Sequence, residues 1–468
     1  MWTDDTSYAP AMGWWLSGVW WGLACTPTAT VETPVDNPPI VEPSVDGRPS
    51  IVLVSWDTVS ATHLALYGGR AQTPNLADLA RTGTLYSQVS THYPQTGISH
   101  WTMLTGAEPA LHGHVARNHD STWIGPTLAQ ELRDQGYTTG AFVGGITMEA
   151  QLTGLDRGFD HYDDRGDPSQ EPKRSARDVV GAARSWISQQ NSPFFALVHL
   201  FDAHYPYEPP DPIARQADPE YTGTVDGSVA SLADYQGAHP PGPVLDARDL
   251  EHVERLYEAE ITLLDEQLGN LLEGLPDGTR VLVTSDHGES FGHGYYFNHR
   301  ESLTDEVLRV PLVTGTVGGT TEGRVVDEAM GLSALYDLIL EQERETTDTV
   351  AAMTDPFEGS GRTTLRRGNT KVTWDGETVQ AFVDDEPVDE MPPWAESERA
   401  EYDQRIEDGK ARTRILEPAT PPTHQQLRQL EALGYVTPGS PPQQRPTGAP
   451  GQQGQRPLRP PSNPPPGQ

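Results

Sequence analysis

The sequence predicts an α/β protein with a doubly wound, mostly parallel sheet and a small C-terminal subdomain of antiparallel strands plus a helix. Apolar, β-branched runs such as "SIVLVSW" alternate along the chain with segments of helical periodicity. This alternation is typical of parallel sheets that are covered by helices on both faces. Three of the runs lead into an acid, and ligands of such sheets bind at the carboxyl ends of the strands.

The expected elements of the main domain follow from periodicity and from cap and turn residues. They are a strand at 50–56, a helix at 73–83, helix–strand pairs within 127–143 and within 175–201, a long amphipathic helix at 250–275 and a strand at 279–285. A Pro-, Gly- and Asp-rich insertion at 208–247 is expected to lie on the surface over the site.

Beyond residue 345 the pattern changes to alternating polar and apolar residues around "DG" and "DD", which predicts a small antiparallel sheet. A helix at 423–433 is expected to close the fold. The resulting division has five parts: an apolar leader (1–25), a Pro/Thr-rich linker (26–48), the main domain (49–345), the small subdomain (346–436) and a disordered Pro/Gln/Gly-rich tail (437–468).

The charge of the chain restricts its partners. It has 67 acidic and 32 basic residues, a formal net charge of -35, so we expect no nucleic acid, heparin-like chain or anionic membrane as a general binding surface. An anionic substrate would need local positive charge, which a metal ion could supply. The alternative interpretation, that the acidity only keeps the surface soluble, stays open.

The single cysteine, Cys25, excludes an intramolecular disulfide and a cysteine-based zinc site. It ends the run "MGWWLSGVWWGLAC", which resembles a bacterial lipoprotein leader and is too short to span a bilayer. We therefore expect an exported protein, either an envelope lipoprotein tethered to the membrane through a lipidated Cys25 or a periplasmic or secreted one. An uncleaved apolar N-terminus is the alternative.

Acids and histidines at three strand ends are candidates for one site. Asp57, Asp202 and Asp286 follow predicted strands, the last with His287 beside it. Carboxylates with one imidazole suit Zn, Mn or Mg, and the ion would polarise a phosphoryl or sulfuryl oxygen. Thr96 precedes a predicted helix and is either a nucleophile or only the cap of that helix.

Five blocks resemble the sulfatase family of the alkaline phosphatase superfamily, in order and spacing, over about 50–345. They are "IVLVSWDTVSATHLALYG", "TPNLADLARTGTLYSQVSTHYPQTGISHWTMLTG", "GLDRGFDHYDD", "LVHLFDAHYPYEPP" and "VTSDHGESFGHGYYFNHRESLTDEVLRVPL". The resemblance implies a metal-dependent ester hydrolase with its nucleophile at a helix N-terminus, a divalent ion such as Zn, Mn or Ca, and an anionic phosphate or sulfate ester as substrate.

By position, the resemblance implies that Asp57, Asp286 and His287 are metal ligands. Thr96 then stands at the nucleophile position, beside the same metal. His100 occupies the place of the signature arginine.

Two further histidines follow from the same resemblance. His204 and His299 match residues that contact the anionic group. Asp202, His204 and His299 could instead bind a second metal, as in two-zinc relatives. Glu289 and His114 are interpreted as solvated or packing residues.

Departures from the family pattern leave the reaction open. Threonine at 96 cannot give the formylglycine of sulfatases, Thr58 replaces an aspartate, and "AFVGGITM" lacks the usual Lys and His. Threonine is the nucleophile in phosphodiesterase and phosphoethanolamine transferase branches of the superfamily. We therefore favour a hydrolase or transferase of phosphate mono- or diesters, with a sulfate ester hydrolase and a catalytically silent envelope protein as alternatives. Glycan sulfate, lipid phosphate, nucleotide and phosphonate substrates all stay open.

Overall fold

The computed structural model describes residues 47–113, 123–165, 173–237, 242–292, 296–300, 302–342, 349–354, 362–376, 378–383, 386–412 and 423–433. The leader with Cys25, the tail at 437–468 and His114 lie outside these ranges, so export and lipidation stay predictions. Within the described ranges, no helix is both long and apolar enough to cross a bilayer.

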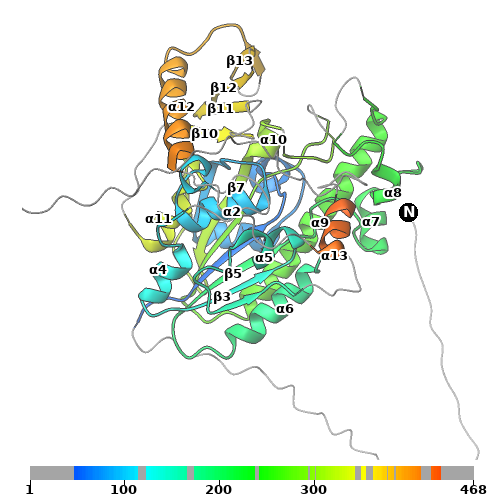
Figure 1. Ribbon diagram of the computed structural model, residues 1–468. Coiled ribbons are helices and arrows are strands. Elements are labelled where there is room, and N and C mark those ends of the chain that lie inside the picture. The colour runs from blue at the N-terminus through cyan, green and yellow to red at the C-terminus, as the bar shows by residue number, and fades with distance from the viewer. Residues whose placement is uncertain are drawn as a thin grey trace, which may run out of the picture. The chain divides into compact units, whose positions relative to one another are not determined.

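The main sheet has nine strands (Figure 1). They are β1 (Ile51–Trp56), β2 (Thr84–Ser90), β3 (Thr138–Val143), β4 (His161–Asp163), β5 (Phe194–Leu200), β6 (Arg280–Ser285), β7 (Arg309–Thr316), β8 (Arg324–Val326) and β9 (Met330–Gly331). Their order is β4-β3-β5-β1-β6-β7-β2-β8, with β9 beside β2. The first five strands in this order are parallel, and β7 runs antiparallel to both of its neighbours, which confirms the predicted doubly wound, mostly parallel sheet.

Helices cover both faces of this sheet. One face carries α1 (Pro74–Thr82), α6 (Ala176–Ile187) and α9 (Ala247–Glu273), and the other carries α2 (Thr96–Thr105), α4 (Leu128–Asp134) and α11 (Ala334–Leu340). The alternation of β1 decides which core each side chain joins: Val52 and Val54 pack toward α6 and α9, whereas Ile51 and Leu53 pack toward α2 and α4. A strand that is buried on both faces is mostly apolar, as β1 is at every position except Ser55.

Short helices complete the main domain. They are α3 (Pro109–His112), α5 (Ala150–Thr153), α7 (Asp211–Ala217), α8 (Val229–Leu232) and α10 (Asp305–Leu308). The insertion at 208–247 contains α7 and α8, and α7 packs against α9.

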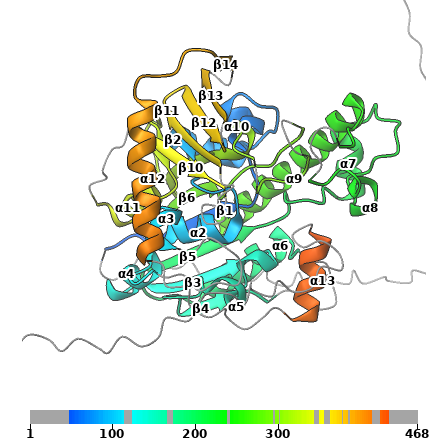
Figure 2. The ribbon, with the colours of Figure 1, turned by 45° about the horizontal axis from the view of Figure 1, so that its top comes forward.

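The C-terminal part forms a second, antiparallel sheet with two helices (Figure 2). Its elements are β10 (Val350–Met353), β11 (Arg362–Arg367), β12 (Thr370–Asp375), β13 (Thr378–Val383), β14 (Glu386–Val388), α12 (Ala395–Arg412) and α13 (His424–Ala432). The antiparallel sheet and α13 confirm the expectation for this region, whereas α12 was not predicted.

Polar contacts join the second sheet to the main domain. The Asp305 carboxylate, at the start of α10, accepts hydrogen bonds from Arg366 and from Lys371, the latter at 2.7 Å. His92, which follows β2, donates from Nδ1 to the Ala351 carbonyl at 2.8 Å. All five groups are buried, so these bonds form away from competing water.

A buried histidine connects the loop after β1 to α9. His63 Nδ1 lies 3.1 Å from Glu258 Oε1, and its Nε2 lies 3.7 Å from Glu306 Oε1. Burial alone would lower the pKa of His63, but hydrogen bonds and attraction from the two glutamates outweigh it and raise the pKa to about 9. His63 is therefore protonated in the folded chain at neutral pH.

This pair of contacts predicts a pH-dependent stability. Because the folded pKa of His63 exceeds its unfolded value near 6.5, the stabilisation is complete below that value and is lost as the pH rises through about 9. It amounts to about 3 kcal/mol at most. Urea unfolding at pH 6 and at pH 9.5 should show His63→Gln losing stability mainly at pH 6. An equal loss at both pH values would contradict the prediction.

Candidate active site

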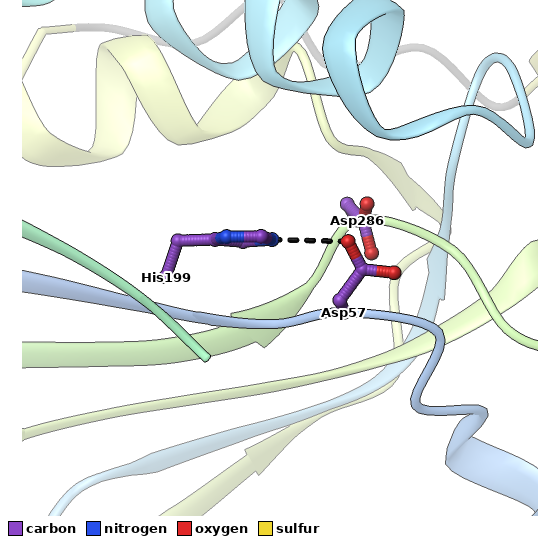
Figure 3. A group of neighbouring side chains, drawn as sticks. All are labelled: Asp57, His199 and Asp286. Atoms are coloured by element: carbon purple, nitrogen blue, oxygen red, sulfur yellow. Dashed lines mark hydrogen bonds and ion pairs between the residues drawn. The ribbon is translucent and has the colours of Figure 1, made fainter. Parts of the chain in front are cut away.

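Two carboxylates and an imidazole meet at the carboxyl ends of three adjacent strands. Asp57 follows β1, Asp286 follows β6, and His199 lies near the end of β5 (Figure 3). One ligand atom from each lies within 4.8 Å of the others, and all three residues are fully buried. His199 Nε2 is 3.0 Å from Asp57 Oδ2, with the ring edge directed at the carboxylate (Figure 3).

The register of the three strands produces this convergence. Ser55 of β1 pairs with His199 of β5, and Trp56 of β1 pairs with Ser285 of β6. Asp57 and Asp286 are therefore the next residues on neighbouring parallel strands, so their side chains leave the sheet at the same edge.

The loop after Asp57 is held in an unusual backbone conformation. Thr58 has a φ of 58°, which a β-branched residue rarely adopts. The Tyr257 hydroxyl of α9 donates to the Thr58 carbonyl at 2.7 Å and accepts from the Ser60 amide at 3.0 Å. The Thr58 amide donates to Asp286 Oδ1 at 3.2 Å, and its hydroxyl donates to the Asp57 carbonyl at 2.8 Å. Thr58 thus supports the two acids through its backbone, and its hydroxyl is committed to the chain.

The donor atoms at this site fit a divalent cation. Among the described residues, Asp57 Oδ1, Asp286 Oδ2 and His287 Nε2 are buried and have no hydrogen-bond partner. His287 Nε2 lies 3.3 Å from Asp286 Oδ2, and its Nδ1 donates to the Gly288 carbonyl at 3.0 Å, which leaves a lone pair on Nε2. Burial and the nearby Asp286 raise the pKa of Asp57 well above its usual range. A cation would compensate both effects, and carboxylates with imidazole suit Zn or Mn.

His199 was not a predicted site residue. It is neutral, because burial lowers its pKa to about 4, and its Nε2–H donates to Asp57. In this state His199 orients the Asp57 carboxylate, and it could bind a metal through Nε2 only after giving up this hydrogen bond. The signal in the sequence is a lone histidine inside the apolar run "FFALVHL".

Thr96 is the first residue of α2 and is not its cap. Gln95 occupies the N-cap position, and its side chain makes no capping hydrogen bond. The Thr96 hydroxyl is buried beside Asp57, and its interaction with that carboxylate lowers the pKa of the acid. The Ser99 hydroxyl donates to the Asp286 carbonyl at 2.8 Å, which fixes α2 against the end of β6. The geometry thus removes the capping interpretation of Thr96.

His100, at the position of the family's arginine, is a neutral group. Its Nδ1 donates to the Thr96 carbonyl at 2.7 Å, and its ring packs edge-on against His199 at 5.0 Å between centroids. Burial, together with His199, lowers the pKa of His100 to about 3. It cannot supply the positive charge of an arginine at neutral pH.

Three histidine rings form the other side of the site. His299 stacks on His287 with centroids 4.2 Å apart, and it meets His204 edge-on at 5.5 Å. His299 Nδ1 also lies 3.4 Å from Glu289 Oε1, and burial raises the pKa of Glu289 to about 8. The interpretation of Glu289 as a solvated or packing residue is incomplete, because this fully buried acid contacts and orients His299.

Asp202 does not join the other acids. Both of its carboxylate oxygens accept from the Ala176 amide at the start of α6, at 2.9 and 3.1 Å. Within the described residues, the one group with the spacing of metal ligands is Asp57, His199 and Asp286, so His287 as a ligand stays a prediction. This arrangement gives no support to a second metal at Asp202, His204 and His299.

A lysine reaches the site from an unexpected part of the chain. The Lys173 ammonium donates to the carbonyls of Asp202 at 3.2 Å, Pro206 at 2.5 Å and His204. It therefore anchors the loop that carries His204, and its charge also lowers the pKa of Asp57. Sequence reasoning missed Lys173 because its partners are backbone carbonyls about 30 residues away.

The fold and this edge of the sheet place the chain in the alkaline phosphatase superfamily. The Sulfatase family model matches residues 49–342, more than half of the chain, and the chain belongs to the sulfatase family. It is an ester hydrolase by that membership, and the family normally binds a divalent metal.

Relatives of known name agree with this family. An arylsulfatase of Clostridium perfringens is 23% identical over 361 residues, which cover 63% of this chain and 74% of the relative. The ulvan-active sulfatase of Formosa agariphila is 24% identical over 299 residues, covering 57% of this chain and 56% of the relative.

Solved structures share the fold. The phosphonate monoester hydrolase of Agrobacterium radiobacter superposes with a TM-score of 0.59 at 19% identity, covering 78% of this chain and 96% of that one. BT4656 in complex with its substrate D-glucosamine-2-N,6-O-disulfate superposes with a TM-score of 0.60 at 15% identity, covering 80% and 100%. Sulfate and phosphonate hydrolases are thus both among the chains of this fold.

The pairing of Asp57 with Asp286 predicts that metal binding stabilises the folded protein and that this stabilisation requires Asp286. In Asp286→Asn the amide oxygen can still accept from Thr58 and His287, but the charge opposite Asp57 is gone. Mn or Zn at 100 times the dissociation constant should stabilise the wild type by about 2.7 kcal/mol, and this gain should be lost in Asp286→Asn.

Without metal, Asp286→Asn should unfold at the same temperature as the wild type or higher, because a like-charge repulsion is removed. Thermal unfolding with and without metal measures both effects. Asp265→Asn is the matched control, since Asp265 is a buried acid that accepts from the Asn75 and Leu76 amides at the start of α1. An equal metal response in all three proteins would refute the assignment.

Loss of the Lys173 anchor should weaken catalysis while metal binding is retained. Lys173→Met removes three hydrogen bonds to the His204 loop, and a displaced catalytic loop costs about 10- to 100-fold in kcat/KM. Hydrolysis of p-nitrophenyl esters and the metal-induced shift in melting temperature are the two readouts. Arg177→Met, on the exposed face of α6, is the control. Unchanged kcat/KM in Lys173→Met would exclude the positioning role.

Proposed function

We propose that this protein hydrolyses phosphate mono- or diesters through Thr96, with a divalent ion held by Asp57, Asp286 and His287. The observation that carries the proposal is the Thr96 hydroxyl, buried at the start of α2 beside Asp57, where it lowers the pKa of that carboxylate. A hydroxyl at this place lies next to the acids that would hold the cation and at a helix N-terminus that favours an anionic group.

The other catalytic roles would be shared between the cation, the first amides of α2 and two histidines. A bound cation would polarise the ester oxygen and lower the pKa of the Thr96 hydroxyl. The amides at the N-terminus of α2 would favour the negative charge of the phosphoryl group. His204 and His299 would contact the anionic oxygens.

The proposed reaction has two steps. The Thr96 hydroxyl gives its proton to solvent water as Oγ1 attacks phosphorus, the bond to the leaving alcohol breaks, and that alkoxide takes a proton from His299 or His204. Water then attacks the phosphothreonine and gives a proton back to the same imidazole. The bond from phosphorus to Oγ1 breaks, phosphate leaves, and Oγ1 takes a proton from solvent water. The contact between Glu289 and His299 would keep the imidazole in one orientation for both proton transfers.

Phosphoryl transfer is favoured over sulfate hydrolysis by the chemistry of residue 96. Threonine carries a methyl group where an aldehyde hydrate would need a second hydroxyl, so it can act only as a simple alcohol. Sulfate ester hydrolysis is the second candidate, because relatives of this chain are named arylsulfatase and ulvan-active sulfatase. A silent domain is disfavoured, because the acids, the histidines and the hydroxyl are all gathered at one edge of the sheet.

A substrate comparison tests the proposal. The purified chain, loaded in turn with Zn, Mn or Ca, should turn over p-nitrophenyl phosphate or bis-p-nitrophenyl phosphate in a metal-dependent way. Thr96→Ala should reduce kcat by at least about 1,000-fold, as expected for loss of a nucleophile. Thr105→Ala, at the other end of α2, should retain activity, since its hydroxyl donates to the Trp101 carbonyl and accepts from the Ala107 amide, both away from the site.

Cleavage of p-nitrophenyl sulfate alone would select the second candidate. If Thr96→Ala matched the wild type on every substrate, the nucleophile assignment would be wrong.

A further inference from the structure

A small cavity adjoins Thr96 on the side of the C-terminal helix. Its volume is about 20 Å³, enough for a group the size of a water molecule or a methyl. Four elements contribute its walls: α2, the short 3-10 helix at 146–148, α5 and α13. The described lining residues are Gln95, Thr96, Gly97, Ile98, Thr147, Leu152, Thr153 and Leu430.

The walls of this cavity are uncharged, with apolar side chains of Ile98, Leu152 and Leu430 beside the polar side chains of Gln95, Thr96, Thr147 and Thr153. Leu152 and Leu430 belong to one buried cluster with Ile146, Phe201 and Leu433. A Cβ at Gly145 would lie 2.6 Å from the Phe201 ring, so a longer side chain at that position would have to displace the ring. The segment that lacks the family's Lys and His is therefore covered by apolar side chains.

The helix that supplies Leu430 is attached at both ends. Gln426 donates from Nε2 to Glu149 Oε2 at 2.6 Å, just before α5. At the other end, Gln236 of the 208–247 insertion donates from Nε2 to the Leu433 carbonyl at 3.2 Å. These bonds fix α13 as a wall of the cavity, and both figures draw it near α5 (Figures 1 and 2).

We propose that this cavity is a subsite for a substituent of the substrate no larger than a methyl group, and that Leu430 sets its limit. The proposal rests on the proposed function in one respect, that the reacting group binds at Thr96. The walls carry no charge to pair with a second anionic group, and Ile98, Leu152 and Leu430 gain from burying a methyl group.

A series of substrates with one leaving group measures the size limit. We expect kcat/KM of p-nitrophenyl alkyl phosphates to be highest for the methyl diester. It should fall at least about tenfold for the ethyl and phenyl diesters, because both substituents exceed the cavity. Leu430→Ala should raise the ethyl diester to at least the value of the methyl diester.

Leu427→Ala is the matched control, since it removes the same atoms from the same helix but Leu427 does not line the cavity. It should leave the selectivity unchanged. Leu430→Val, a smaller change, should shift the selectivity in the same direction as Leu430→Ala and serves if the alanine variant does not fold.

A binding measurement separates this inference from the proposed reaction. Calorimetry of the metal-loaded wild type with methyl-, ethyl- and phenylphosphonate does not depend on turnover. Tightest binding of methylphosphonate, with the preference over ethylphosphonate lost in Leu430→Ala but kept in Leu427→Ala, would support the subsite even if no p-nitrophenyl ester were cleaved. Turnover or binding that is indifferent to substituent size, or to Leu430, would overturn the subsite while leaving Thr96 as nucleophile.

Discussion

Two carboxylates buried against each other at the end of the central strands determine how the rest of the site is built. Asp57 and Asp286 are fully removed from water, and each makes the charge of the other more costly. Three hydrogen-bond donors stabilise these carboxylates: the Thr58 amide, the His287 amide and the His199 ring. Tyr257 then holds the Thr58 loop in its rare conformation. The acceptor atoms that remain without partners are those a cation can use.

The parts of this site that sequence could predict are those fixed by local pattern. Asp57, Asp286 and His287 directly follow apolar runs, and the carboxyl ends of parallel strands meet at one edge. His199 could not be assigned in this way, because a histidine inside a buried strand reads as a packing residue until the register with β1 is known. The role of Glu289 could not be predicted from the sequence either, because only the fold shows that it contacts His299.

The fold, like the site, has elements that the sequence could predict and elements that it could not. The parallel strands were predictable because each must be apolar on both faces, whereas α12 was not, because its sequence is mostly charged and buries few large side chains. Tyr402 and Ile406, one turn apart, are its buried contacts to Tyr93 and Ile98 beside Thr96. Such a short stripe gives little periodic signal, and the helix owes its place to tertiary packing.

The Asp305 contact has a consequence for how this chain can be divided. Asp305 follows the loop of His299, and its two cationic partners, Arg366 and Lys371, belong to the second sheet. A chain ending near residue 345 would lose both of these cations and would leave Leu303 and Leu308 without their packing against Ala352 of β10. The boundary visible in the sequence is therefore not a boundary of stability. Exchange of this C-terminal region between relatives would succeed only if α10, β11 and β12 were inherited together.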